Sequence, residues 1–118
     1  MIKNLLLVAL GGAVGTVGRY LVSKYLDCSF PWATLTVNLL GSLLIGILTG
    51  LIAKGTLSPE MKLLLVTGFC GGFTTFSTFA NESFTMIKAA DYLSTAIYAG
   101  VSVAVGILAV FLGMKMAA

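Results

Sequence analysis

Four long stretches of the chain contain no charged residue, and most of their positions are apolar. The stretches are residues 4–18, 28–53, 63–81 and 92–114. A helix needs about 20 apolar residues to cross the hydrocarbon core of a membrane. The pattern therefore predicts an all-α membrane protein of one domain, residues 1–118, with four transmembrane helices. We expect the spans at about residues 4–26, 33–53, 63–87 and 92–115.

The composition excludes several classes of protein. Apolar residues make up 58% of the chain and charged residues only 9%, whereas soluble domains contain about 25% charged residues. The chain has no histidine and only two cysteines, Cys28 and Cys70, which we interpret as small apolar fillers. No nucleophile and base stand in a catalytic pattern. We expect neither an enzyme, nor a zinc protein, nor a nucleic-acid-binding domain.

The first apolar stretch has a second interpretation, because Lys3 followed by an apolar run is also typical of a signal peptide. Arg19 interrupts that run, and three further spans follow it. We therefore expect the first stretch to be a membrane span.

The charges of the loops do not select one orientation. With four spans, one side of the membrane holds four basic residues and the other side holds three. They are Lys3, Lys54, Lys62 and Lys115 on the first side, and Arg19, Lys24 and Lys88 on the second. Orientation follows an excess of Lys and Arg on the cytoplasmic side, and here there is almost none. A chain of this kind could insert both ways and pair with its inverted copy.

Glycines recur at a spacing of four on the first two spans. Gly11 and Gly15 form one such pair, and Gly46 and Gly50 form another. Small residues at this spacing let helix backbones approach closely in lipid. The pairs predict either packing within one subunit or a seam between two subunits, and the first is at least as plausible.

Polar side chains follow one face of two spans. On the second span they are Thr34, Asn38, Ser42 and Thr49, and on the fourth they are Ser94, Tyr98 and Ser102. Spacings of four and seven place such residues on one stripe of a helix. Neutral polar groups in a membrane either bond across helices or line a pathway. For Asn38, whose amide offers two donors, the two interpretations are equally good.

The third span contains a segment that disfavours a helix. Residues 68–79 read GFCGGFTTFSTF, with three glycines and three threonines in the middle of a crossing. A break there frees backbone groups at membrane depth, which is tolerated only where protein or a cavity satisfies them. Such breaks commonly make ion sites from carbonyl oxygens.

Aromatic and charged residues next to this segment allow two readings. Phe76 and Phe79 are either packing residues or rings whose electropositive edges face an anion beside the hydroxyls of Ser77 and Thr78. Arg19, the only arginine, either snorkels to the interface or provides a positive mouth for an anion pathway.

Three segments together resemble the CrcB/Fluc family of fluoride ion channels. They are residues 11–20 (GGAVGTVGRY), residues 34–42 (TLTVNLLGS) and residues 68–79, the most specific of the three. The resemblance covers the whole chain in order. Ala33, Thr16 and Leu43 depart from the residues frequent in the family, and none of them removes a polar group from the suspected pathway.

The resemblance implies a function and an assembly. It implies a passive fluoride channel that exports fluoride from the cytoplasm across a bacterial inner membrane. It also implies an antiparallel, dual-topology homodimer with a broken third helix and two pores, each lined by both subunits. The pore residues would be Asn38, Phe76, Phe79, Ser77, Thr78, Tyr98 and Ser102, with Arg19 at the vestibule. The carbonyls of Gly71 and Thr74 from both copies would hold one structural sodium ion.

Two other functions remain open from the sequence. A proton-coupled small multidrug transporter also has four spans, but it needs a carboxylate inside the membrane. Glu82, late on the third span, is the only candidate, and it could also cap or pair locally. A structural subunit of a larger complex would explain the glycines but not the polar stripes.

Overall fold

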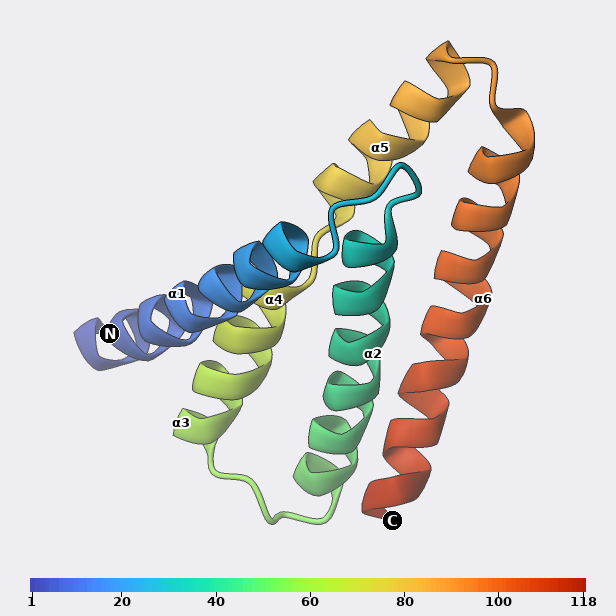
Figure 1. The fold of residues 1–118 in the computed structure, drawn as a ribbon. Helices are drawn as coiled ribbons and strands as arrows, with labels where there is room; N and C mark the ends of the chain where they lie inside the picture. The colour runs from blue at the N-terminus through green and yellow to red at the C-terminus, as the bar shows by residue number, and fades with distance from the viewer.

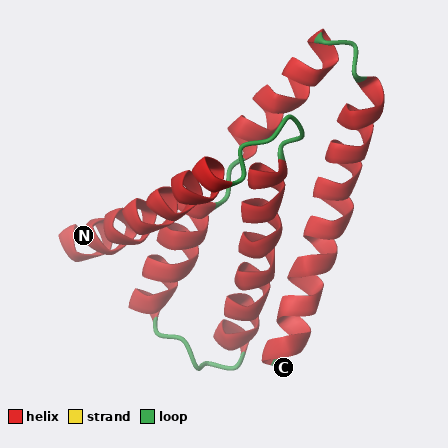
Figure 2. Cartoon of the chain, viewed as in Figure 1, coloured by secondary structure: helices red, strands yellow, loops and turns green.

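The computed structural model describes residues 1–118, all of them in helices or short connections (Figure 1, Figure 2). The three uninterrupted long helices are α1 (Ile2–Tyr25), α2 (Trp32–Ala53) and α6 (Tyr92–Ala117). The third predicted span consists of α3 (Pro59–Lys62), the π-helical η1 (Leu63–Cys70), α4 (Gly71–Phe73) and α5 (Phe76–Lys88).

Four segments are long and apolar enough to cross a membrane, which confirms the predicted all-helical class and the number of spans. The helices begin and end a few residues outside the predicted spans, at Ile2, Pro59 and Ala117. The longest dimension of the subunit is 47 Å. A bilayer with its headgroup regions is about 40–45 Å thick, so the subunit is long enough to span it.

Helices α2 and α6 lie side by side over most of their length (Figure 1). Glycines make this approach possible, because a Cβ at Gly46 would overlap the backbone carbonyl of Val110. From the other helix, a Cβ at Gly113 would overlap the carbonyl of Leu43. The two backbones are therefore in direct contact, and any larger residue at either position would force them apart.

Helix α1 crosses the first half of the third span in the same way. A Cβ at Gly11 would overlap the carbonyl of Leu64, and a Cβ at Gly15 would overlap that of Phe69. Gly72 of α4 approaches the backbone of α1 in return. Of the two readings of the glycine pairs, packing within one subunit therefore holds for the pair on α1, and also for Gly46 and Gly50 on α2, which both meet α6.

The subunit has a small interior and a large apolar exterior. Only 14 of its 118 residues are buried, and many large apolar side chains on α1, α5 and α6 point outward. Apolar surface of this extent is stable only against lipid or against another protein surface. The fold therefore requires a membrane around it, and it leaves room for a second subunit.

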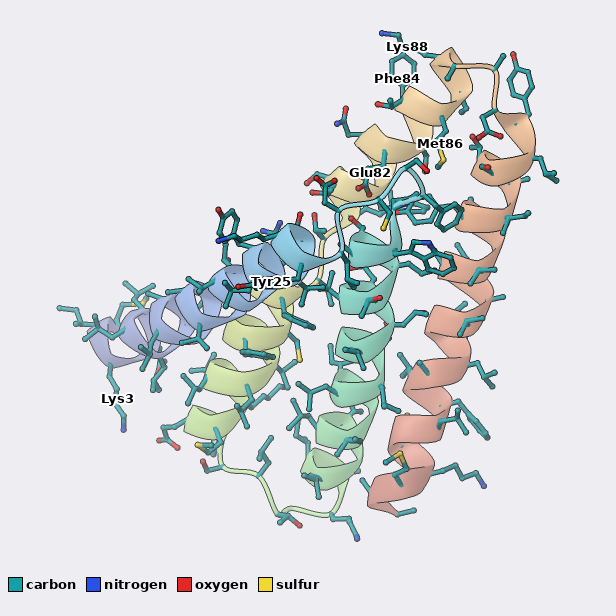
Figure 3. All side chains as sticks on the ribbon, in the orientation of Figure 1. Lys3, Tyr25, Glu82, Phe84, Met86 and Lys88 are labelled. Atoms are coloured by element: carbon teal, nitrogen blue, oxygen red, sulfur yellow. The ribbon has the colours of Figure 1, made fainter.

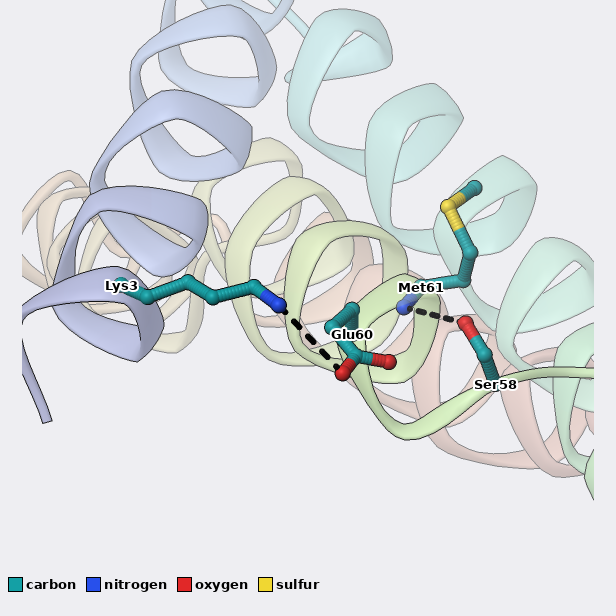
Figure 4. A network of polar contacts seen from close by, with 4 residues as sticks. All are labelled: Lys3, Ser58, Glu60 and Met61. Atoms are coloured by element: carbon teal, nitrogen blue, oxygen red, sulfur yellow. Dashed lines mark hydrogen bonds and ion pairs between the residues drawn. The ribbon is translucent and has the colours of Figure 1, made fainter.

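A weak ion pair joins the N-terminal end of α1 to α3. Lys3 lies 3.6 Å from Glu60, and the Ser58 hydroxyl accepts a hydrogen bond from the amide of Met61 as the cap of α3 (Figure 4). Both charged side chains are largely exposed. Exposed ion pairs contribute about 0–1 kcal/mol, so this pair is not what holds the fold.

Candidate functional site

The third span is interrupted after Phe73. Thr74 and Thr75 have extended backbone, with ψ angles of 158° and 125°, and they separate α4 from α5. Thr75 is the N-cap of α5, where its hydroxyl accepts a hydrogen bond from the amide of Thr78 at 3.2 Å. We call Thr74 and Thr75 the interruption. Threonine is a preferred N-cap residue, because its side-chain oxygen satisfies an amide of the first helical turn. A new helix therefore starts directly after Thr75.

Side chains from two other helices form hydrogen bonds with the backbone at and just before the interruption. Asn38 of α2 forms two hydrogen bonds with Thr75: its Oδ1 accepts from the Thr75 amide at 2.8 Å, and its Nδ2 donates to the Thr75 carbonyl at 3.0 Å. Arg19 of α1 donates from Nε to the carbonyl of Gly72 at 3.1 Å. Three of the backbone groups freed by the interruption, the Gly72 carbonyl and the amide and carbonyl of Thr75, are thereby satisfied.

A cavity of about 470 Å³ lies beside the interruption, between α2, η1, α5 and α6. Its polar lining consists of amide and hydroxyl side chains and backbone, and no lining residue is charged. The lining residues are Asn38, Gly41, Ser42, Ile45, Val66, Thr67, Cys70, Gly71, Thr74, Thr75, Phe76, Phe79, Ser102 and Val103. The cavity therefore brings together residues that the sequence analysis drew from three separate spans.

Two of the predicted rings form the aromatic side of this cavity. The ring centroids of Phe76 and Phe79 are 5.9 Å apart, and Phe79 lies 5.0 Å from the ring of Tyr98. Phe76 is 79% exposed on the isolated subunit, an unusual state for a phenylalanine whose neighbours line a cavity. Its outer face is available to a second subunit or to an ion.

Tyr98 is fully buried and donates a hydrogen bond to Glu82 at 2.9 Å. The carboxylate lies midway along α5 (Figure 3). Of the two sequence interpretations of Glu82, local pairing is the one the contacts support. Neither residue lines the large cavity, so Tyr98 contacts it only through the ring of Phe79.

The remaining predicted pore residues do not all line the large cavity. Thr78 and Ser77 both lie within hydrogen-bond distance of the Thr75 hydroxyl, at 3.2 and 3.4 Å. Ser102 lines the large cavity, and its buried hydroxyl has no protein partner. Arg19 lies elsewhere, at a second cavity of about 30 Å³ that it shares with Thr34, Thr75 and Thr78.

The predicted cation ligands are the neutral carbonyl oxygens of two residues at the large cavity. Thr74 and Gly71 line the large cavity, and a Cβ at Gly71 would meet nothing within 4 Å, so this side of the backbone is open. The subunit has no cluster of His, Cys, Asp or Glu that could hold a metal. Neutral carbonyls are suitable ligands for a hard ion of low charge.

Thr75 is the residue that the sequence analysis missed. It contacts Asn38, Ser77 and Thr78, and it lines both cavities. A signal for it exists in the sequence, since a threonine directly after a glycine-rich segment and before a new helix is typical of an N-cap.

Four helices long and apolar enough to cross a membrane, with an uncharged cavity lined by three of the four spans, define a multi-pass membrane protein. Residues 6–114 match the family described as CrcB-like protein, Camphor Resistance (CrcB), and the chain belongs to this family.

Similar proteins share the full length of the chain. A protein of Leptospira interrogans serovar copenhageni, named fluoride-specific ion channel FluC, is 48% identical over 119 residues, covering 97% of this chain and 94% of its own. Proteins with the same name from Phocaeicola vulgatus and Chlorobaculum tepidum are each 47% identical. They cover 97% and 99% of this chain, and 98% and 96% of their own lengths.

Proposed function

We propose that this protein is a passive channel for fluoride, and not an enzyme, that lets fluoride leave the cytoplasm across the bacterial inner membrane. The observation that carries the proposal is the uncharged cavity beside the interruption, lined by amide and hydroxyl groups and by two phenylalanine rings. Family membership and the names of the relatives support the choice of ion.

The lining suits a small, strongly hydrated anion. Each donor must replace part of the hydration shell, yet none may hold the ion so tightly that it cannot leave. Amide, hydroxyl and ring-edge groups meet this condition, whereas a fixed ammonium in the cavity would trap the anion. In the pathway Asn38, Ser77, Thr78 and Ser102 offer donors, and Phe76 and Phe79 offer ring edges. Tyr98 extends the track, and Arg19 attracts anions at its mouth.

The complete channel is an antiparallel homodimer with two pores, each lined by both subunits. The broken third helix of each copy meets that of its partner at the centre. The exposed face of Phe76 and the open side of the large cavity support this arrangement, because both lack a covering element within the subunit. The carbonyls of Gly71 and Thr74 from both copies hold one sodium ion, which ties the two interruptions together.

The proton-coupled transporter is not favoured. Such a transporter needs a titratable carboxylate facing its substrate. Glu82 is bonded to Tyr98 and lies outside the lining of the cavity.

Fluoride efflux from liposomes tests the proposal. Purified protein in liposomes loaded with potassium fluoride should release fluoride to an external electrode only when an ionophore carries the potassium charge. Chloride in place of fluoride should give almost no flux. Release that requires a proton gradient and carries no current would contradict the channel and indicate a transporter.

A further inference from the structure

The carbonyls of residues 71–74 have all lost the backbone amide that a continuous helix would supply. In an α-helix the amide of residue i bonds the carbonyl of residue i−4. The Thr75 amide, which would bond the Gly71 carbonyl, instead donates to Asn38 Oδ1 at 2.8 Å. The Thr78 amide, which would bond the Thr74 carbonyl, instead donates to the Thr75 hydroxyl at 3.2 Å. Side chains have thus taken both donors, and the two carbonyls are released.

Between these two lie the carbonyls of Gly72 and Phe73, and only that of Gly72 accepts a hydrogen bond. Its donor in a continuous helix would be the amide of Phe76, and its place is taken by Arg19 Nε at 3.1 Å. A carbonyl oxygen that accepts from a guanidinium is a poor ligand for a cation, because the positive charge of the arginine repels a second cation.

Asn38 has one donor left after its contacts with Thr75. Its amide carries two hydrogens, and the structure uses Nδ2 for one bond to the Thr75 carbonyl. The remaining hydrogen is on a side chain that lines the large cavity. The same amide that withdraws the Thr75 N–H from Gly71 can therefore also donate to an anion.

We propose that Asn38, Thr75 and Arg19 are positioning residues for the cation site: the first two release the carbonyls of Gly71 and Thr74, and Arg19 blocks the carbonyl of Gly72. The inference rests on the proposed function and deepens its cation site. Its consequence is that a side-chain hydroxyl which touches no cation, that of Thr75, controls how tightly the cation binds.

Thr75→Val is the variant that isolates this effect. Valine has the shape of threonine but cannot accept from the Thr78 amide, so α5 loses its N-cap and the extended backbone of Thr74 and Thr75, which presents the carbonyls, loses its support. The purified full-length protein is equilibrated for days in sodium chloride mixed with N-methylglucamine chloride at constant total salt, and its melting temperature is measured at each sodium concentration. A ligand that binds only the folded state raises this temperature as its concentration rises.

We expect Thr75→Val to need about tenfold more sodium than the parent protein for half of the stabilisation, an effect equal to about 1.4 kcal/mol of binding. Thr75→Ser keeps the hydroxyl and should stay within about twofold of the parent. Thr85→Val is the matched control, because the Thr85 hydroxyl bonds only the Asn81 carbonyl on the exposed part of α5. It should leave the sodium dependence unchanged.

A sodium dependence of Thr75→Val equal to that of the parent overturns the proposal. If Thr75→Val does not fold, Thr75→Gly replaces it, since glycine is tolerated at N-caps at a cost of a few tenths of a kcal/mol while lacking the hydroxyl. Fluoride flux is measured on the same samples. A parent that binds sodium but conducts no fluoride refutes the channel and leaves the positioning intact. A parent that conducts without any response to sodium refutes the positioning alone.

Discussion

At the scale of single residues, the two rings beside the cavity distinguish an anion pathway from simple packing. The edge of a phenylalanine ring is electropositive, and contacts with it contribute on the order of 1 kcal/mol. Phe76→Ile and Phe79→Ile keep apolar volume but remove that edge. We expect each to lower fluoride flux in liposomes by about tenfold or more, with the protein still folded.

Phe84 is the control for the two rings. It lies two turns farther along α5, is 57% exposed and does not line the cavity. Phe84→Ile should therefore conduct at nearly the parent rate. If both cavity variants also conduct normally, the rings serve packing and do not face the ion.

Asn38→Asp tests the amide that joins the cavity to the interruption. Aspartate keeps an oxygen for the Thr75 amide but places a second oxygen against the Thr75 carbonyl, where Nδ2 now donates at 3.0 Å. It also adds a negative charge that repels an anion. We expect near-complete loss of fluoride flux, while size-exclusion chromatography still gives the elution volume of the parent. Undiminished flux would remove Asn38 from the pathway.

At the scale of helices, the sequence was sufficient to predict the number of spans and the segment of the third span in which the helix is interrupted. Uncharged runs of about 20 residues have few alternatives to a membrane helix. The cavity was partly predictable as well, since Asn38 and Ser102 were marked by their position on a polar stripe, and Phe76 and Phe79 by their place in the glycine-rich segment of the third span. What the sequence could not supply was the contact between Arg19 and Gly72, because it joins residues 53 positions apart. The sequence analysis also placed Thr49 on the polar stripe of α2, but the Thr49 hydroxyl bonds only the carbonyl of Ile45 on its own helix.

Glycines provide a prediction at this scale, because they divide into two groups. Gly11 packs directly against the backbone of η1, so the added methyl group of Gly11→Ala must push α1 away from the third span. Overpacking of this kind typically costs about 1–3 kcal/mol. Gly100, in the middle of α6, has nothing within 4 Å, and alanine there is the better helix former. In a monomer Gly100→Ala should be neutral or slightly stabilising.

Chemical denaturation in detergent and a crosslinking assay of subunit association measure the two variants. We expect Gly11→Ala to lower the stability of the fold without a specific effect on association. Gly100→Ala should weaken association if a second subunit approaches α6 at this point. Unchanged association in Gly100→Ala would place the subunit contact elsewhere on the exposed apolar surface.

At the scale of the whole molecule, the subunit is incomplete by itself. With 14 buried residues it has little interior, and its uncharged cavity opens next to an exposed phenylalanine. An inverted second copy would cover that opening, and the near-even distribution of basic residues permits both orientations. Basic residues occur at both ends of the subunit, since Lys3 near the N-terminus and Lys88 at the end of α5 lie far apart (Figure 3).

Labelling of a single cysteine tests whether both orientations form. The background carries Cys28→Ser and Cys70→Ala, so that Lys3→Cys is the only thiol. Lys3 is exposed and takes part only in the weak pair with Glu60, so its replacement should not disturb the fold. In intact cells a membrane-impermeant maleimide should modify about half of the protein, and the other half should react only after the membrane is opened. The near-even distribution of basic residues between the two sides is the physical reason for the even split. Modification of all molecules from one side would show a single orientation and rule out the antiparallel homodimer.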